Sequence, residues 1–319
     1  MQNIKFRNIK KILITGGAGY IGSILSTVLL DNGYKITVID NLKYSKDSVD
    51  HLMANKDFNL IISDVRDTKV LKKIINKFDL IIPLAALVGA PLCDKFPKLA
   101  KELNEDHISF ILDNIGKKQK IIYLNSNSGY GIGKKNKFCD EKSPLKPISL
   151  YGRTKVNSEK KIIKLNNYII FRLATVFGYS YRMRTDLLLN NLVYHSLKHK
   201  IIEIYEPNFR RNFIHVRDVC YAILFSIKNF NKLKNNIYNL GLSSGNITKL
   251  QMIKKIKKYN KNFKYKIVKN QKDIDKRDYF VSNKKIERKG FKARISLDDG
   301  INELLKIFTK NMKIYKNNY

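Results

Sequence analysis

Residues 15–22, TGGAGYIG, constrain the fold more than any other part of the sequence. Gly16, Gly19 and Gly22 follow an apolar segment and precede a helical pattern, which is typical of the phosphate-binding turn of a βαβ unit. The first glycine permits a tight bend, the second lets the backbone approach a pyrophosphate, and the third allows the helix to pack closely on the sheet. Free N–H groups at the helix N-terminus then bind the phosphates. The motif predicts a dinucleotide-binding domain.

Short apolar strands alternate with helical patterns through the first half of the chain, which predicts a doubly wound parallel sheet of the Rossmann type. We expect strands at 12–15, 35–40, 58–62, 80–83, 120–125 and 168–173, and helices at 20–31, 67–77, 97–115 and 149–165. After Gly178 the alternation loosens, with helices expected at 185–198, 216–229, 248–259 and 297–310 and short strands at 201–205, 212–215 and 236–240. This predicts an α/β fold with a Rossmann domain at 1–178, to which 212–240 returns, and a smaller mixed C-terminal substrate domain at 179–319.

Asp40 closes the second expected strand, downstream of the glycine motif. A carboxylate there accepts both ribose hydroxyls of NAD and repels the additional phosphate of NADP. Lys43 and Lys46 follow closely in the sequence and leave NADP open as an alternative. Asp64, just past the third strand, lies at the same edge of the sheet, where it can reach the adenine.

Residues 151–155, YGRTK, place Tyr151 and Lys155 four positions apart on an expected helix, so both side chains lie on one face. A neighbouring ammonium favours the phenolate of tyrosine, whose usual pKa of about 10 makes it a poor base at neutral pH. The segment LNSNSGYG (124–131) ends the fifth strand, in the cleft where parallel sheets bind ligands. Ser126 is the candidate hydroxyl, Ser128 is the alternative, and turn formation is the other role open to each.

The formal net charge of +35 would suit a nucleic-acid or membrane partner. Only 12 of the 62 basic residues are arginines, however, and the lysines are spread over every segment, so we interpret the charge as compositional drift. We therefore expect no specific nucleic-acid partner. An arginine fork grips phosphate in a bidentate way that lysine does not. Five of the arginines in the expected substrate domain are candidates for this role: Arg182, Arg184, Arg210, Arg211 and Arg277.

Three scattered cysteines, Cys93, Cys139 and Cys220, lack the spacing of a disulfide framework or a zinc site. We therefore predict no metal and a reducing, cytoplasmic location. The longest uncharged run, 80–93, is shorter than the ~20 residues that a membrane helix needs, and it indicates a buried strand followed by a loop. No apolar leader precedes the glycine motif, so we expect neither a membrane partner nor a secretory signal.

In its glycine motif, its YGRTK segment and the other segments given below, the sequence resembles the extended short-chain dehydrogenase/reductases. Among these it resembles the NAD-dependent epimerase/dehydratase family, which acts on nucleotide sugars. The resemblance implies NAD as cofactor, a nucleotide sugar as substrate, and a homodimer or higher homo-oligomer. The matching segments are TGGAGYIG (15–22), VIDNL (38–42), LAALVG (84–89), NSNSGYG (125–131), YGRTK (151–155), FRLATVFG (171–178), RRNFIHVRDV (210–219), YNLG (238–241) and DKRDY (275–279).

The resemblance also implies a role for each matching residue. Ser126 would be the catalytic hydroxyl, Tyr151 the base, and Lys155 the residue that binds the nicotinamide ribose and tunes Tyr151. Cofactor contacts are expected at Gly16, Gly19, Tyr20, Ile21, Gly22, Asp40, Asn41, Asp64, Val65, Leu84, Ala85, Ala86, Tyr151 and Lys155. Substrate contacts are expected at Ser126, Asn127, Thr175, Arg184, Asn190, Arg211 and Arg277, with the last two at the nucleotide diphosphate.

Two departures from the family pattern narrow the activity. Asn127 and Ser128 stand where sugar-nucleotide 4,6-dehydratases carry an acidic pair, which argues against dehydration, and Thr175 replaces a usual asparagine. The segments IIPLAALVGAPLCDK (81–95), NSNSGYGIG (125–133), FRLATVF (171–177) and RDYFVSN (277–283) are most similar to GDP-glycero-manno-heptose 4-dehydrogenases of bacterial surface-polysaccharide pathways.

The resemblance therefore implies NAD-dependent oxidation at C4 of a nucleotide-activated sugar, with GDP-heptose as the expected substrate. A nucleotide-sugar 4-epimerase is the alternative within the family. A non-catalytic dinucleotide-binding or nucleic-acid-associated protein is the alternative from another class.

Overall fold

The computed structural model describes residues 9–134, 137–268 and 277–310. The first eight residues, where we expect no secretory leader, and residues 275 and 276 of the DKRDY segment lie outside the described residues. Within the described ranges, no helix combines the length and the apolar character that crossing a bilayer requires.

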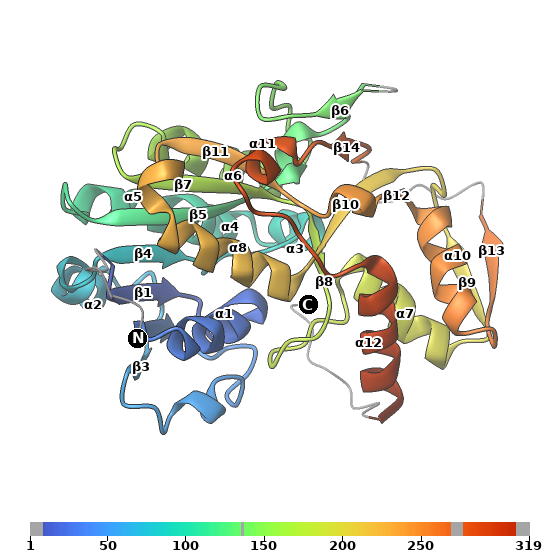
Figure 1. The fold of residues 1–319 in the computed structure, drawn as a ribbon, viewed down its shortest axis with the longest axis horizontal. Coiled ribbons are helices and arrows are strands. Elements are labelled where there is room, and N and C mark those ends of the chain that lie inside the picture. Colours follow the sequence, from blue (N-terminus) through green and yellow to red (C-terminus); the bar gives the residue numbers. More distant parts are fainter. Residues whose placement is uncertain (1–8, 135–136, 269–276, 311–319) are drawn as a thin grey trace.

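A seven-stranded parallel sheet forms the centre of the molecule (Figure 1). Its strands are β1 (Lys11–Thr15), β2 (Lys35–Asp40), β3 (Phe58–Ile62), β4 (Leu80–Pro83), β5 (Lys120–Ser126), β7 (Tyr168–Leu173) and β11 (Asn236–Leu240). The strand order is β11–β7–β5–β4–β1–β2–β3, so the chain runs outward from β1 to β3 and then returns to β4 on the other side of β1. Parallel sheets bind ligands where the order reverses in this way, at the carboxyl ends of the strands.

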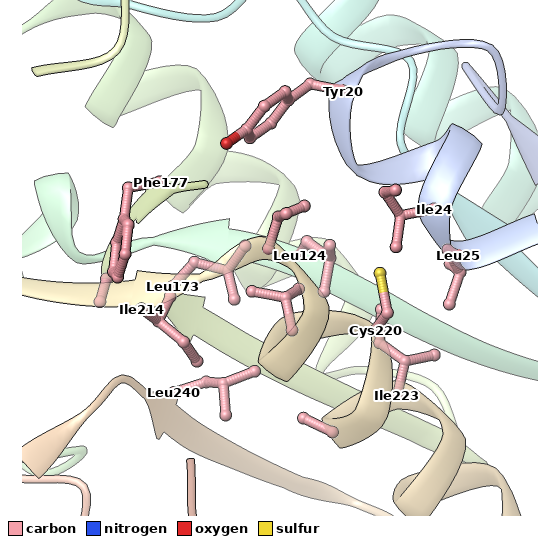
Figure 2. Packing of buried hydrophobic residues seen from close by; sticks show 14 of the residues in the cluster. Tyr20, Ile24, Leu25, Leu124, Leu173, Phe177, Ile214, Cys220, Ile223 and Leu240 are labelled. Atoms are coloured by element: carbon pink, nitrogen blue, oxygen red, sulfur yellow. The ribbon is translucent and has the colours of Figure 1, made fainter. Parts of the chain in front are cut away.

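Helices cover both faces of the sheet and form a hydrophobic core on each face. Alternate residues of a strand point into the two cores. The helices α1 (Tyr20–Asp31) and α8 (Val216–Lys228) pack on one face. On the other face lie α2 (Thr68–Ile74), α5 (His107–Asn114) and α6 (Leu150–Ile162). In β5, Ile122 and Leu124 join the first core, and Ile121 and Tyr123 join the second. Figure 2 shows the first core, where side chains of α1 and α8 meet those of the strands: Ile24, Leu25, Cys220, Ile223, Leu124, Leu173 and Leu240.

The C-terminal part contributes smaller sheets and three long helices, which lie together beside one end of the central sheet (Figure 1). In its three-stranded sheet, β10 (Arg210–His215) is parallel to β8 (Thr175–Phe177) and antiparallel to β12 (Asn246–Thr248). The strand β9 (Ile201–Ile204) pairs with β13 (Lys264–Ile267). The helices are α7 (Leu188–Lys198), α10 (Lys249–Tyr259) and α12 (Leu297–Lys310). The predicted class, a Rossmann-type α/β fold with a smaller mixed C-terminal part, is confirmed.

The segment after β4 differs from the prediction. The expected loop contains α3 (Ala90–Lys95). The helix expected over 97–115 is present as α4 (Pro97–Lys101), the π-helical turn η3 (Glu102–Asp106) and α5, which follow one another without a gap. Asn104 lies in this π-helical turn, and its side chain accepts a hydrogen bond from Leu87 N (2.8 Å) and donates one to Leu87 O (2.9 Å).

The remaining elements are short. Residues 75–77 lie within the helix expected at 67–77, and sequence patterns did not indicate the others. The strand pair β6 (Phe138–Cys139) and β14 (Phe280–Val281) has two residues in each strand. The other elements are η1 (Asp50–Leu52), η2 (Ile75–Lys77), η4 (Asn127–Tyr130), α9 (Phe230–Leu233), η5 (Ser243–Gly245) and α11 (Lys284–Arg288).

Candidate active site

The glycine motif forms the turn between β1 and α1. Gly16 has a φ of +73°, and a Cβ there would lie 2.5 Å from Ala85 N, so this position excludes any side chain. A Cβ on Gly22 would lie 2.6 Å from the Cα of Gly17, so Gly22 lets α1 pack on its own turn rather than on the sheet. Gly19 caps α1 without a side chain, which leaves the first turn of the helix open to a phosphate.

One cavity of about 590 Å³ lies next to this turn, at the carboxyl ends of the central strands. All the residues predicted as cofactor contacts line it: Gly16, Gly19, Tyr20, Ile21, Gly22, Asp40, Asn41, Asp64, Val65, Leu84, Ala85, Ala86, Tyr151 and Lys155. Tyr20 also belongs to the first core (Figure 2), and its hydroxyl donates a hydrogen bond to Gly178 O (2.6 Å). The turn and the cavity together fit a dinucleotide, since any side chain at Gly16 would fill the turn.

Two carboxylates stand in this part of the cavity. Asp40 accepts hydrogen bonds from Ala18 N (3.0 Å) and Leu42 N (2.9 Å), and burial nevertheless raises the pKa of its carboxyl. Asp64 is bonded instead by the Arg66 guanidinium (2.9 and 3.0 Å), which lowers the pKa of Asp64 to about 2. Asp40 is therefore the carboxylate placed to accept ribose hydroxyls, whereas Asp64 already holds an arginine.

The predicted catalytic trio lies in the same cavity, on two elements. Ser126 ends β5, and Tyr151 and Lys155 lie one turn apart on α6, whose N-cap Ser149 accepts a hydrogen bond from Gly152 N (3.1 Å). Lys155 is 5% exposed, and its Nζ lies 4.1 Å from the centroid of the Tyr123 ring. A hydroxyl, a phenol and an ammonium thus face one space, which suits proton transfer at a carbinol carbon.

The charge relation within the trio differs from the sequence-based expectation. Burial raises the pKa of Tyr151 to about 12, and the cations that act against this rise are Arg277 and Arg184, with a hydrogen bond from Ser126. Burial also lowers the pKa of Lys155 to about 7. In the protein alone, burial therefore has the largest effect on the pKa of Tyr151.

Of the predicted substrate contacts, Ser126, Thr175, Arg184, Arg211 and Arg277 line the cavity. Arg211 is 2% exposed, and its Nη1 donates to Arg210 O (2.9 Å). The side chain of Arg210 pairs with Asp278 (2.8 Å) and is not part of the cavity lining. Arg184 is held by Asp186 through its Nε (3.1 Å) and Nη2 (2.5 Å) atoms. These arginines therefore have set orientations before any ligand binds.

Two predicted substrate contacts, Asn127 and Asn190, do not belong to the cavity lining and need correction. The Asn127 amide, oriented to satisfy both its atoms, donates to Arg172 O (3.0 Å) and accepts from Ala174 N (3.3 Å). Asn190 accepts from Gly178 N (3.0 Å) and donates to Arg184 O (2.8 Å). Both side chains are buried and bind backbone groups, so they shape the cavity walls without reaching its space.

The structure adds polar lining residues that the predicted site lacked: Lys43, Tyr44, Arg66, Asn125, Arg182, Asp186, Asn191, Lys249 and Tyr279. Arg182 was already among the five arginines noted in the substrate domain, and its Cζ lies 5.0 Å from the Tyr44 ring centroid. Lys249 gave no signal, because lysine is common in every segment.

Comparisons with known proteins agree with this geometry. The family model described as "NAD dependent epimerase/dehydratase family" matches residues 12–241. An uncharacterized protein of Methanocaldococcus jannaschii is 30% identical, over 95% of this chain and 97% of its own. A protein of the same organism, named as a putative UDP-glucose 4-epimerase, is 28% identical over 94% of this chain and 99% of its own.

Solved structures share the fold. The UDP-glucose 4-epimerase of Thermotoga maritima has a TM-score of 0.81 at 24% identity, covering 95% of this chain and 100% of its own. The UDP-N-acetylglucosamine 4-epimerase of Methanobrevibacter ruminantium has a TM-score of 0.82 at 23% identity, covering 95% and 99%.

Proposed function

This chain belongs to the NAD-dependent epimerase/dehydratase family, and from this premise we propose that it inverts the configuration at C4 of a nucleotide-activated sugar. Membership makes it an enzyme of the nucleotide-sugar epimerase/dehydratase type with NAD as cofactor. The observation that supports chemistry at the sugar C4 is that Ser126, Tyr151 and Lys155 line the same cavity as the glycine turn and Asp40.

The glycine turn and Asp40 would hold NAD, which when bound would accept the hydride of the sugar C4 and later return it to the other face of the 4-ketone. Ser126 holds the C4 oxygen by a hydrogen bond, and Tyr151 takes the proton of that hydroxyl. The guanidinium groups of Arg277 and Arg184 favour the phenolate against the effect of burial. In the reverse step Tyr151 returns the proton to the oxygen after the ketone has presented its other face.

The substrate side of the cavity suits an anionic nucleotide. Arg184, Arg211, Arg277 and Lys249 line it, and Asp186 is the acidic residue among them. Guanidinium groups bind phosphate oxygens in a bidentate way, and a nucleoside diphosphate brings two such groups. We assign Arg211 and Arg277 to the diphosphate.

A 4-epimerase is favoured over a 4-dehydrogenase because several relatives bear names of UDP-glucose 4-epimerases. A GDP-heptose 4-dehydrogenase is the second candidate, favoured by residues 81–95, whose sequence resembles those enzymes. Dehydration is disfavoured, because Asn127 and Ser128 carry no carboxyl group and are buried beside the cavity rather than in it.

The test is incubation of the purified protein with NAD and a panel of UDP-, GDP- and dTDP-sugars. We expect the C4 epimer to form with no net NADH, measured by product analysis and NADH absorbance. Stoichiometric NADH with a 4-keto product would establish the dehydrogenase instead. The same assay tests Tyr151→Phe, which removes the hydroxyl of the proposed base. Tyr181→Phe is its matched control, because Tyr181 is 44% exposed and lies outside the cavity lining.

We further propose that residues 1–178, with 212–240, bind NAD and that 179–319 bind the nucleotide sugar. A cytoplasmic location is proposed from three cysteines that are free. A homo-oligomer with α6 as a contact element is proposed from the family resemblance, and sedimentation analysis tests it.

A further inference from the structure

A buried ion pair joins α6, which carries Tyr151 and Lys155, to the strand β7. Arg172 donates to Glu159 through Nη2 (2.6 Å to Oε1) and Nε (3.1 Å to Oε2). The two side chains are 5% and 4% exposed, and neither belongs to the described cavity lining. Because burying such a pair gives little net stability, another role is needed to explain it.

The pair reaches Ser126 through Asn125. Asn125 and Arg172 are register partners on the neighbouring strands β5 and β7, so their side chains lie on the same face of the sheet. The Asn125 amide donates to Glu159 Oε2 (2.5 Å), and its oxygen accepts from Ser126 N (2.7 Å). One amide therefore connects the carboxylate directly to the backbone of the candidate catalytic serine.

The same carboxylate is part of the helix that carries the rest of the trio. Tyr151, Lys155 and Glu159 are spaced by four residues on α6, so they follow one another along one side of the helix. Glu159 is therefore part of α6 and is connected to β5 by its hydrogen bond with Asn125.

A third connection holds the turn after Ser126. The Nη1 of Arg172 donates to the Tyr130 hydroxyl (3.1 Å) and to Glu141 O (3.2 Å). The Tyr130 hydroxyl in turn donates to Asn239 Oδ1 (2.6 Å). Because Tyr130 ends η4, this turn is held at its start by Asn125 and at its end by Arg172.

We propose that Glu159 is a positioning residue which, with Asn125 and Arg172, fixes the separation between Ser126 on β5 and Tyr151 and Lys155 on α6. This inference rests on the proposed function, which gives those three side chains the chemistry. A misplacement of about 1 Å between reacting groups costs about a hundredfold in rate. Arginine suits position 172, because its planar fork bonds Glu159 and Tyr130 at once, whereas lysine has a single ammonium.

The test compares Glu159→Gln, Arg172→Lys and Asn125→Ala with the wild type. Asp298→Asn is the matched control, since it breaks the ion pair with Lys255 (2.5 Å), which lies outside the cavity lining. We expect kcat to fall by about ten- to a hundredfold in the three variants, with KM and NAD affinity within about threefold. The control keeps the wild-type kcat. Asn125→Ala leaves the ion pair intact, so it tests the link to Ser126 even where the other two variants do not fold.

Amide hydrogen exchange at residues 126–130, measured without substrate, is the second readout. We expect faster exchange there in the variants and no change in the control. Folded variants with the wild-type kcat would overturn the inference, as would a loss of activity that only follows the folded fraction. If the wild type turns over no nucleotide sugar, the proposed function fails, and unchanged exchange at 126–130 then overturns this inference separately.

Discussion

Lys155 is expected to lower the free energy of unfolding of the protein, although the proposed reaction requires it. Its ammonium is 5% exposed, and burial lowers its pKa from 10.5 to about 7. We predict that Lys155→Met gives a more stable protein near pH 7 that has lost turnover. Methionine has an unbranched side chain of similar length, so it fills the same space without a charge.

The magnitude follows from the pKa of the buried ammonium. At ~1.4 kcal/mol for each pKa unit, the fall from 10.5 to about 7 corresponds to a destabilisation of about 5 kcal/mol. The contact between Nζ and the Tyr123 ring, 4.1 Å away, offsets about 1–2 kcal/mol. The variant is therefore expected to gain about 3 kcal/mol in the free energy of unfolding.

The gain has a defined pH dependence. Below about pH 7 Lys155 is protonated in both the folded and the unfolded chain, so the whole cost of burying the charge is present. Between about pH 7 and pH 10.5 only the unfolded chain holds the proton, and the cost declines. Above pH 10.5 the amine is neutral in both states and the advantage of the variant disappears.

Urea denaturation of nucleotide-free wild type and variant, near pH 7 and near pH 10.5, measures this difference. Other titrating groups are common to both proteins and cancel. Lys254→Met, at an exposed position on α10, is the control and is expected to change stability little at either pH. A Lys155→Met variant that is no more stable near pH 7, or whose advantage is equal at both pH values, would refute the reasoning.

Four further predictions concern the cavity. Tyr151→Phe should lower turnover by about a thousandfold or more and leave the calorimetric NAD affinity within about threefold; near-normal turnover would rule out Tyr151 as the base. Gly16→Ala should lower the unfolding free energy by about 1–3 kcal/mol and weaken NAD binding, because its Cβ would lie 2.5 Å from Ala85 N at a φ of +73°. Wild-type values of both quantities would contradict this geometry. Asp40→Ser should raise the NADP/NAD ratio of kcat/KM by about tenfold or more, because the carboxylate no longer repels the additional phosphate; an unchanged ratio would show that Asp40 does not select the cofactor. Arg211→Lys should raise KM for the nucleotide sugar by about tenfold with little change in kcat, and an unchanged KM would remove it from the diphosphate site.

The sequence allowed the central sheet to be predicted almost to the residue. Its strands are continuous apolar runs bounded by turn residues, and the expected limits 35–40, 58–62, 80–83 and 168–173 match β2, β3, β4 and β7. Buried parallel strands carry this local signal because both of their faces are covered.

Elements set by distant contacts escaped prediction. The helix α3 begins at a glycine with a φ of +102° and has a proline in its first turn, a composition that reads as a loop. The π-helical turn η3 carries Asn104, which pairs with the backbone of Leu87, and no local pattern reveals this turn or this pairing. The two-residue strands β6 and β14 are too short to show a period.

The candidate site was likewise predicted only in part. Ser126, Tyr151 and Lys155 line one cavity, as their order and spacing predicted. Asn127 and Asn190 do not, because an asparagine near a cavity binds backbone groups as readily as ligands, and only packing decides between the two. Asp186 and Lys249 were missed because a single charge in a basic, lysine-rich chain carries no local signal.

The position of β11 has a consequence for synthesis of the chain. β11 closes the edge of the sheet beside β7 but is made much later, after β8, α7, β9, β10 and α8. While the ribosome is still adding these segments, the six residues of β7 expose a row of unpaired backbone N–H and C=O groups, and such an edge recruits other chains. A fragment truncated at residue 178 would keep that edge permanently. It is therefore expected to aggregate, or to depend on chaperones, rather than fold into a minimal nucleotide-binding domain.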